Sequence, residues 1–302
     1  MSILYASDAA RGAVFTEIFA REAPELPVHI GTAPDPEKVE YLVTWAPPDL
    51  RLYPRLKLLF STGAGVDQFD LSALPPQARV VRMLEPGIAA QMCEYVTLAV
   101  LGLHRDLPTY LNQQRAGHWQ LGKDHPAALR RVGVMGLGQL GQAVLHALAP
   151  FGFARAGWAR SPRQIDGVEV FTDLDAFLAR TDILICLLPL TPQTEGMLDA
   201  ALFARLPEGA MLVQVGRGRQ TDQEALLAAL DSGHLSAAWL DVTEPEPLPQ
   251  DHPLWSHPRV IVTPHIASRT RAEDGARYVL KTIRAHQSGQ PVPGLVDPDK
   301  GY

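Results

Sequence analysis

The segment that most constrains the fold of this chain is Gly136-Leu137-Gly138-Gln139-Leu140-Gly141. A glycine pattern of this kind is a weak signal by itself, but here it follows an apolar run at 130–135 and opens a helix expected over 139–150. Strand, glycine turn and helix in this order are typical of a dinucleotide-binding unit. The first glycine permits the tight turn, the second lets the backbone approach a pyrophosphate, and the third allows close packing of helix on strand. The N-terminus of the helix offers N–H groups to the phosphates.

The end of the next strand, expected over 154–159, indicates which dinucleotide is favoured. A site specific for NAD places Asp or Glu there, about 20 residues beyond the glycine turn, to hold the ribose 2′-hydroxyl. In this chain no acid occurs before Asp166, and Arg160, Ser161 and Arg163 stand in its place. Two guanidinium groups and a hydroxyl suit a 2′-phosphate, although two arginines also occur in ordinary solvated turns. The missing acid and the arginines agree, so the sequence favours NADP(H), with NAD(H) as the alternative.

Short apolar runs alternate with helical stretches on both sides of the glycine turn, which predicts an α/β fold with parallel sheets in two domains. The apolar stretch 87–107 predicts one long helix between the two series, and no strand is expected in the polar segment 110–129. Strands are expected over 2–6, 28–30, 41–45, 56–61, 79–82, 130–135, 154–159, 183–188, 211–215, 237–241 and 260–263, and helices over 10–20, 139–150, 173–179 and 270–287.

Composition narrows the class of partner. The chain has 302 residues, enough for two domains, with 46% apolar and 20% charged residues and a formal charge of −6. It shows no basic patch for nucleic acid, and we expect no apolar stretch to approach a membrane span, so neither partner is predicted. Cys93 and Cys186 lie in separate apolar runs, which favours unpaired thiols, and no metal-ligand spacing occurs. The N-terminus lacks a secretory pattern, so we expect a cytoplasmic protein.

Three groups suited to carbonyl reduction follow three separate strands, at the edge where open α/β sheets bind ligands. Arg217 stays cationic and can bind a carboxylate through two hydrogen bonds. His265 is a suitable proton donor near neutral pH, and Glu246 is the candidate to orient its ring. Each residue alone has an ordinary structural explanation, and Glu244 is a second acid in the same loop. Together they predict an active site that reduces a 2-oxo acid.

These motifs resemble those of the D-isomer-specific 2-hydroxyacid dehydrogenases over nearly the whole chain, and most of all the bacterial subgroup of glyoxylate/hydroxypyruvate reductase A. The segments that carry the resemblance are STGAGVDQFD (61–70), GLGQLG (136–141), WARS (158–161), LLPLTPQTEGM (187–197), VGRGR (215–219), LDVTEPEPLP (240–249), TPHIAS (263–268) and DPDKGY (297–302).

The resemblance implies two Rossmann-like domains. A discontinuous, flavodoxin-like substrate domain at 1–98 and 270–302 would hold a central NAD(P)-binding domain at 99–269. It also implies NADPH-dependent reduction of glyoxylate or hydroxypyruvate, with Arg217, Glu246 and His265 as the catalytic set and His265 as the proton donor. Besides the glycine turn and the arginines, the implied cofactor contacts are Leu188, Pro189, Val215, Gly216, Arg217, Asp241 and His265.

The same resemblance implies substrate contacts and a homodimer. The turn Ala64-Gly65 would offer N–H groups to the substrate carboxylate, beside Arg217 and His265. Trp45 and Arg271 match positions that line the substrate pocket, although core packing of Trp45 and a solvated position for Arg271 are equally open. The segment 110–129 is the expected place for the dimer contact.

The chain departs from the family pattern at Gln214, where Asn is usual, and this change leaves the catalytic groups in place. Two alternatives stay open. One is oxidation of another 2-hydroxy acid or of formate on the same scaffold, against which Arg160 argues because that chemistry is linked to NAD. The other is a dinucleotide-sensing interaction protein, which would not need Arg217, Glu246 and His265 together.

Overall fold

The computed structural model describes residues 2–297, so most of the segment DPDKGY lies outside the described residues. The described chain separates into two compact units. The terminal unit consists of the chain up to Ile88 and from Arg269 onward, and the central unit is Ala89–Ser268. The first boundary therefore falls at the beginning of a helix, ten residues before the boundary at 98 that the family pattern implies. Both units are α/β structures with parallel sheets, as the strand and helix pattern predicted.

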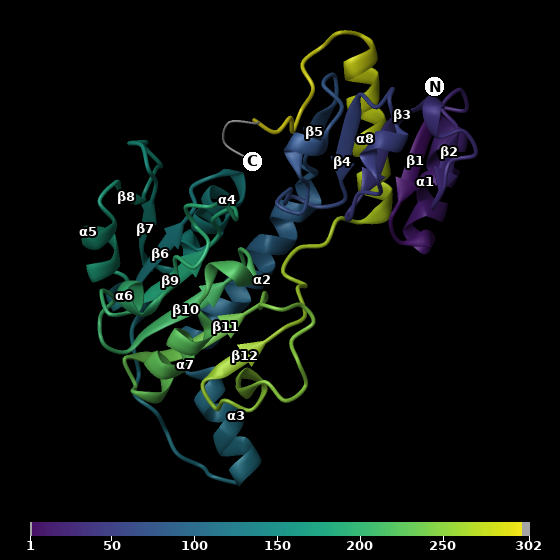
Figure 1. The fold of residues 1–302 in the computed structure, drawn as a ribbon. Helices are drawn as coiled ribbons and strands as arrows, with labels where there is room; N and C mark the ends of the chain where they lie inside the picture. Colours follow the sequence, from purple (N-terminus) through teal and green to yellow (C-terminus); the bar gives the residue numbers. More distant parts are fainter. Residues whose placement is uncertain (1, 298–302) are drawn as a thin grey trace. The chain divides into compact units, whose positions relative to one another are not determined.

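The terminal unit contains a parallel sheet in the order β2-β1-β3-β4-β5 (Figure 1). Two helices pack against each other beside this sheet, although they come from opposite ends of the chain. Arg284 of the second helix donates to the carbonyl of Glu22, the last residue of the first, at 2.6 Å. The elements of this unit are β1 (Ser2–Ala6), α1 (Ala9–Glu22), β2 (Val28–Ile30), β3 (Val39–Thr44), β4 (Leu58–Ser61), β5 (Arg79–Val81) and α8 (Ala272–Gln287).

The central unit contains a parallel sheet in the order β12-β11-β10-β9-β6-β7-β8. Its strands are β6 (Arg131–Met135), β7 (Ala154–Trp158), β8 (Glu169–Phe171), β9 (Ile183–Cys186), β10 (Ala210–Gln214), β11 (Leu235–Leu240) and β12 (Val260–Val262). Its helices are α2 (Pro86–His104, which begins in the terminal unit), α3 (Leu107–Ala116), α4 (Gln139–Ala147), α5 (Leu174–Ala179), α6 (Ala200–Phe203) and α7 (Gln223–Asp231).

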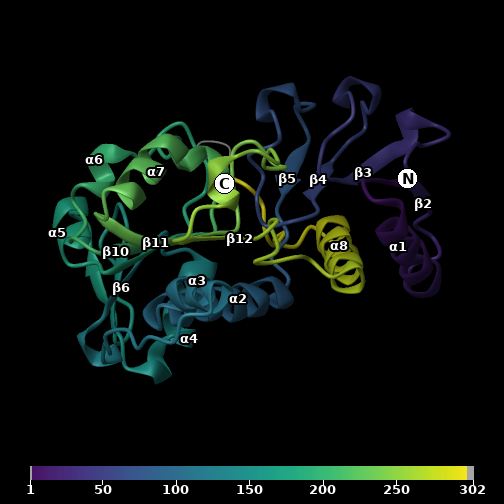
Figure 2. The same ribbon diagram turned by 90° about the horizontal axis from the view of Figure 1, so that it is seen from below.

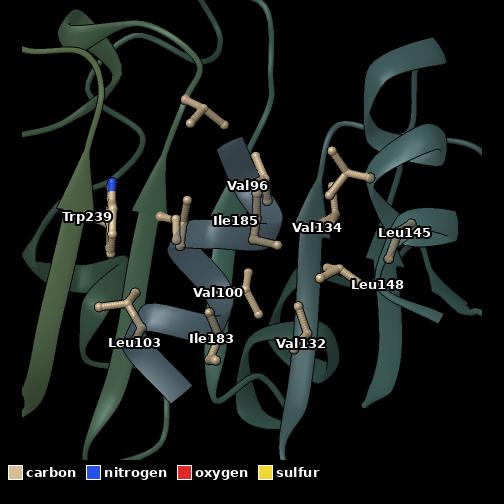
Figure 3. Close-up of a cluster of buried hydrophobic side chains, with 14 of the residues drawn as sticks. Val96, Val100, Leu103, Val132, Val134, Leu145, Leu148, Ile183, Ile185 and Trp239 are labelled. Atoms are coloured by element: carbon tan, nitrogen blue, oxygen red, sulfur yellow. The ribbon is translucent and has the colours of Figure 1, made fainter. Parts of the chain in front are cut away.

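Both faces of the central sheet are buried, and alternate strand residues serve the two faces. On β9, Ile183 and Ile185 belong to one hydrophobic cluster, whereas Leu184 and Cys186 belong to the other. Figure 2 shows α2, α3 and α4 on one side of this sheet and α5, α6 and α7 on the other. Figure 3 shows the first cluster, in which Val96, Val100 and Leu103 of α2 face the side chains of β6 and β9. Because both faces are covered, only the strand ends can present polar groups to a ligand.

Helix α2 corrects one expectation. It is 19 residues long with a mean hydropathy of 1.3 over its most apolar window, so by length and composition alone it could cross a membrane. A helix buried in the core of a globular protein has the same composition. Met92, Val96, Ala99, Val100 and Leu103 are all buried in the cluster against the central sheet, and this packing explains the apolar residues on that face of the helix, whereas Leu98 is 56% exposed.

The other differences from the expected elements have local causes. The helix expected over 87–107 ends at His104, because Asp106 adopts a left-handed conformation (φ 54°) and a new helix, α3, begins at Leu107 with Pro108 in its first turn. The segment 110–129, in which no strand was expected, contains most of α3. Strand β8 and helices α6 and α7 were not predicted. β8 and α6 have only three and four residues, which is too few to show a hydrophobic period. Helix α7, by contrast, has a recognisable N-cap in Asp222, whose side chain accepts a hydrogen bond from the Ala225 N–H.

Candidate active site

The glycine turn lies between β6 and α4 as predicted. Gly136 has φ 103°, a conformation that other residues rarely adopt. A Cβ on Gly141 would lie 1.9 Å from the Gly136 carbonyl oxygen, so helix and strand approach too closely for a side chain. By contrast, a Cβ on Gly138 would meet nothing within 4 Å, and no side chain caps α4 there. The exposed residues Gly138 and Gln139 and the half-buried Leu140 therefore lie at a helix N-terminus with open space beside Gly138, which fits a pyrophosphate.

The residues expected to recognise a 2′-phosphate follow β7. Arg160, Ser161 and Arg163 are all exposed. The Arg163 guanidinium donates from Nη1 to the carbonyl oxygen of Leu137 at 2.6 Å, which places this cation directly against the glycine turn. One of its N–H groups is thus used within the protein, while the others remain available geometrically for a ligand. The structure brings Arg163 and the glycine turn together, and these residues fit a dinucleotide with an additional phosphate.

The segment after β9 forms the next border of the turn. A Cβ on Gly136 would lie 2.6 Å from the carbonyl oxygen of Leu187, so the half-buried Leu188 and Pro189 follow immediately beside the glycine turn. The carbonyl groups of Leu188 and Pro189 each accept a hydrogen bond from Gln220 Nε2 at 3.1 Å. These hydrogen bonds connect the segment beside the glycine turn with the turn that follows β10.

That turn contains Val215, Gly216 and Arg217, directly after the last residue of β10. Val215 and Gly216 are buried, and Arg217 is half-buried with an extended backbone (φ −138°, ψ 146°). The Arg217 side chain donates from Nη1 to the carbonyl oxygen of Gly216 at 2.9 Å. A short helical turn, Gly218–Gln220, follows at once and fixes the end of the segment.

The structure joins His265 to Glu246. His265 Nδ1 lies 2.8 Å from Glu246 Oε2, and the two side chains are 34% and 40% exposed. The backbone N–H of Thr243 donates to the other oxygen of Glu246 at 3.2 Å. Glu244, in contrast, is fixed through its backbone, which exchanges two hydrogen bonds with the side chain of Gln223. The choice of Glu246 over Glu244 as the partner of His265 therefore agrees with the geometry of the loop.

The charge on Glu246 is stabilised by its neighbours. Burial raises the pKa of this carboxyl group, but the hydrogen bond and charge of His265, the Thr243 N–H and the charge of Arg217 outweigh it, so that the pKa lies below its usual range. Arg217 and His265 thus both act electrostatically on the same carboxylate. With Nδ1 directed at Glu246, the other ring nitrogen of His265, Nε2, is the atom suited to proton transfer.

A buried carboxylate holds the His265 turn in place. The two oxygens of Asp241, which is 2% exposed, accept from the Thr263 hydroxyl at 2.7 Å and from the backbone N–H groups of Ile266 and Ala267 at 2.8 Å each. The His265 N–H donates to the Asp241 carbonyl at 2.9 Å. His265 itself has φ 52°, which costs a residue with a side chain about 1–2 kcal/mol. These bonds offset that strain, so Asp241 is an anchor of the turn through its side chain.

The other expected substrate residues, apart from Arg217 and His265, lie in the terminal unit. Trp45 directly follows β3 and is 40% exposed, and the half-buried Ala64 and Gly65 follow β4. A Cβ on Gly63 would lie 3.3 Å from the Trp45 ring, so Trp45 and this turn are neighbours within the unit. Arg271 precedes α8, has a 68% exposed side chain, and lies 3.6–3.7 Å from the carboxylates of Glu273 and Asp274.

Sequence reasoning missed one polar residue of this site and underrated another. Gln220 was not considered, and Gln214 was noted only as a departure, yet both side chains are fully buried and hydrogen-bonded to the Arg217 turn. Gln220 lies in the polar stretch GRGRQTDQE (216–224), so the sequence carried no signal that its side chain would be buried. Among residues 2–297, no group of three or more His, Cys, Asp or Glu side chains could hold a metal ion.

The fold and this arrangement define a dinucleotide-binding α/β protein with a paired histidine and carboxylate at the ends of its strands. The family model of the D-isomer specific 2-hydroxyacid dehydrogenases, NAD binding domain, matches residues 97–267. A curated relative, glyoxylate/hydroxypyruvate reductase A of Yersinia enterocolitica, is 41% identical over 279 residues, which is 89% of each chain.

Two solved structures extend this similarity to the whole chain. A D-isomer specific 2-hydroxyacid dehydrogenase of Xanthobacter autotrophicus in complex with NADPH and MES is 40% identical, with a TM-score of 0.93 over 100% of this chain and 99% of that one. An NADPH-dependent glyoxylate/hydroxypyruvate reductase of Sinorhizobium meliloti in complex with NADP and sulfate is 33% identical, with a TM-score of 0.90 over the same shares. The chain belongs to the D-isomer-specific 2-hydroxyacid dehydrogenases, and the resemblance found in its motifs is confirmed.

Proposed function

We propose that this enzyme reduces a small 2-oxo acid, glyoxylate or hydroxypyruvate, to the 2-hydroxy acid with NADPH. The observation that carries the proposal is the 2.8 Å contact between His265 and Glu246, in a unit that also contains the glycine turn and Arg217. The similarity to reductases of glyoxylate and hydroxypyruvate from Yersinia and Sinorhizobium supports this substrate class.

The preference for NADPH over NADH rests on the end of β7. Arg160, Ser161 and Arg163 occupy the place where an NAD site needs an acid, and Arg163 reaches the glycine turn. The structures similar to this chain include complexes with NADPH or NADP. The glycine turn would hold the pyrophosphate, and Leu188, Pro189, Val215 and Gly216 would border the rest of the cofactor.

The three catalytic residues act on different parts of the reaction. Arg217 binds the substrate carboxylate and polarises the 2-oxo group, because a guanidinium offers parallel donors to a carboxylate. When bound, the reduced nicotinamide supplies a hydride to the carbonyl carbon. His265 donates the proton from Nε2 to the carbonyl oxygen, which becomes the hydroxyl of the product. Glu246 orients the ring through Nδ1 and stabilises the imidazolium before the proton leaves.

We assign the remaining substrate contacts to the terminal unit. The backbone N–H groups of Ala64 and Gly65 would bind the substrate carboxylate, and Trp45 and Arg271 would limit the size of the pocket. The half-buried turn and the exposed Trp45 ring, which are neighbours at the ends of β3 and β4, support this role. In this proposal the terminal unit is the substrate domain and the central unit the NADP(H) domain.

We also propose a homodimer that functions in the cytoplasm. The segment after α3 exposes large apolar side chains, with Trp119 99%, Leu121 88% and Leu129 76% exposed. Burial of such side chains against a second copy of the chain would be favourable. Both cysteines, Cys93 and Cys186, are free, as expected in a reducing compartment.

The test follows the ultraviolet absorbance of NADPH, and separately of NADH, with purified protein and glyoxylate or hydroxypyruvate. We expect rapid loss of NADPH absorbance with at least one of the two acids, slower turnover with NADH, and almost no turnover for His265→Ala. Turnover with NADH alone would contradict the roles of Arg160 and Arg163 but leave the reductase. NADPH binding without turnover of any small 2-oxo acid would contradict the proposed reaction and favour a sensor.

A further inference from the structure

Two buried glutamines enclose the backbone of Arg217. Gln214 is the last residue of β10, Gln220 ends the short helical turn, and both are 0% exposed. A buried carboxamide is costly unless its donor and acceptor groups are satisfied, so its partners indicate what it holds. Here the partners of both side chains converge on one residue.

Gln214 binds the carbonyl side of Arg217. Its Nε2 donates to the Arg217 carbonyl oxygen at 3.2 Å and to the Thr221 hydroxyl at 2.9 Å, and its Oε1 accepts from the Gly216 N–H at 3.0 Å. The side chain thus bridges the turn from the end of the strand to the residue that follows the helical turn. This arrangement uses both ends of the carboxamide.

Gln220 binds the amide side of Arg217. Its Oε1 accepts from the Arg217 N–H at 2.8 Å, and its Nε2 donates to the carbonyl groups of Leu188 and Pro189 at 3.1 Å each. One carboxamide therefore links the residue proposed to bind the substrate with the segment proposed to border the cofactor. Because these two segments are far apart in the sequence, the hydrogen bonds of a local turn could not connect them.

The turn is also packed against the loop that carries Glu246. A Cβ on Gly218 would lie 1.8 Å from the carbonyl oxygen of Thr243, so the backbone of the turn and that of the loop are in direct contact. The Thr243 N–H in turn binds Glu246. A rotation of the Arg217 peptide would therefore have to displace this loop or leave buried polar groups unpaired, and both are unfavourable.

We propose that Gln214 and Gln220 are positioning residues that fix the direction in which the Arg217 guanidinium projects, and that Gln220 couples this direction to the Leu188–Pro189 segment. The inference rests on the proposed function of Arg217 as the group that binds the substrate carboxylate. Neither glutamine needs to touch the substrate. Their hydrogen bonds act on the N–H and the carbonyl oxygen of the residue that does.

The test replaces each carboxamide by a side chain of similar length without these hydrogen-bonding groups, in Gln220→Met and Gln214→Met. Thr181→Val is the matched control. Thr181 is also fully buried in the central unit, and its hydroxyl donates one hydrogen bond, at 2.7 Å, to the carbonyl of Phe177. For each protein we would measure the affinity for oxamate, a 2-oxo acid analogue that cannot be reduced in this way, by calorimetry of the NADPH complex. For each protein we would also measure the affinity for NADPH, the unfolding temperature and kcat/KM.

Both methionine variants should weaken oxamate binding and lower kcat/KM by about tenfold, because each loses hydrogen bonds that hold Arg217. NADPH affinity should change by less than about threefold for Gln214→Met, which has no contact with the Leu188 segment. Thr181→Val should lower the unfolding temperature without weakening oxamate binding.

The decisive measurement repeats each methionine substitution in an Arg217→Lys background. A residue that acts through Arg217 should lose most of its effect there, whereas a residue that only stabilises the fold should reduce oxamate binding by the same factor in both backgrounds. The inference would be overturned if a methionine substitution reduced the oxamate affinity by the same factor in both backgrounds, or if neither methionine variant changed the oxamate affinity. The proposed reductase function would remain in both cases. If Gln220→Met does not fold, Gln214→Met carries the same cycle from the carbonyl side of Arg217. A wild-type protein that neither binds oxamate nor oxidises NADPH would instead refute the proposed function, and the inference with it.

Discussion

Replacement of Glu246 by Gln tests how the site controls its proton donor. Gln keeps the size of the side chain and a hydrogen-bond acceptor for His265 Nδ1, but removes the negative charge 2.8 Å away. A hydrogen bond to a charged group contributes about 1.5–3 kcal/mol when buried, and an exposed ion pair about 0–1 kcal/mol. Because both side chains are more than a third exposed, we discount the buried figure to about 1–2 kcal/mol.

This free energy stabilises the imidazolium form, which must be present at the start of reduction. Loss of about 1–2 kcal/mol of this stabilisation should lower kcat/KM of Glu246→Gln by about 5- to 30-fold. The pH dependence follows from the carboxylate. The pKa of Glu246 is lowered, so its carboxylate stays charged until the pH falls through that lowered value, where the wild type should lose kcat/KM and Glu246→Gln should lack this loss.

The assay is NADPH oxidation over a range of 2-oxo acid concentrations at each pH, from which kcat/KM is obtained, at constant ionic strength because exposed charges are screened by salt. Glu244→Gln is the matched control, since Glu244 lies in the same loop but is held through its backbone by Gln223. The control should keep the wild-type profile. An unchanged kcat/KM in Glu246→Gln, or an equal loss of kcat/KM in Glu244→Gln, would refute the pairing of His265 with Glu246 in the working enzyme.

Four further outcomes follow from the described contacts. Gly138→Ala should change the free energy of unfolding by no more than about 0.5 kcal/mol, because the added Cβ would contact no protein atom. The same substitution should weaken NADPH binding at least about tenfold, and unchanged binding in a fluorescence titration would contradict a pyrophosphate site at Gly138. Asp241→Asn should lower the free energy of unfolding by about 2–4 kcal/mol in urea titrations, because an amide N–H group would face backbone donors, and an unchanged urea midpoint would argue against this anchor. Arg160→Asp should reduce the ratio of kcat/KM for NADPH over NADH by about ten- to a hundredfold, and a ratio that stays the same would remove this residue from cofactor selection. Trp119→Ala should shift the sedimentation profile toward the monomer, whereas an unaltered profile would place the contact elsewhere.

The dinucleotide unit was predictable because its signals are local in sequence. A strand, a glycine turn and a helix occur within a few residues of one another, and each glycine answers a steric need that the structure shows at Gly136 and Gly141. The order of the expected strands likewise gave the parallel α/β class. The ends of elements were less predictable, as at Asp106, where a left-handed backbone ends a run that remains apolar in sequence.

The candidate site was predictable only in part, because some of its contacts join distant segments. Chemistry identifies His265 as a proton donor but does not choose between Glu244 and Glu246, so the choice of Glu246 rested on the family resemblance and agrees with the contact in the fold. Gln220 resembles any polar residue of a surface turn until the structure places its carboxamide between Arg217 and the Leu188–Pro189 segment. Such a role depends on tertiary hydrogen bonds, and no spacing in the sequence encodes it.

The pairing of α1 with α8 has a consequence for synthesis on the ribosome. The buried side chains of α1, including Phe15, Ile18 and Phe19, belong to a unit that is completed only by residues from Arg269 onward. Translation of the intervening Ala89–Ser268 takes roughly 10–40 s at about 5–20 residues per second. During this interval the central unit can fold as a continuous segment, while the nascent terminal unit lacks α8 as the cover for α1. We therefore expect a nascent chain stalled before Arg269 to be a substrate for chaperones that bind apolar helices.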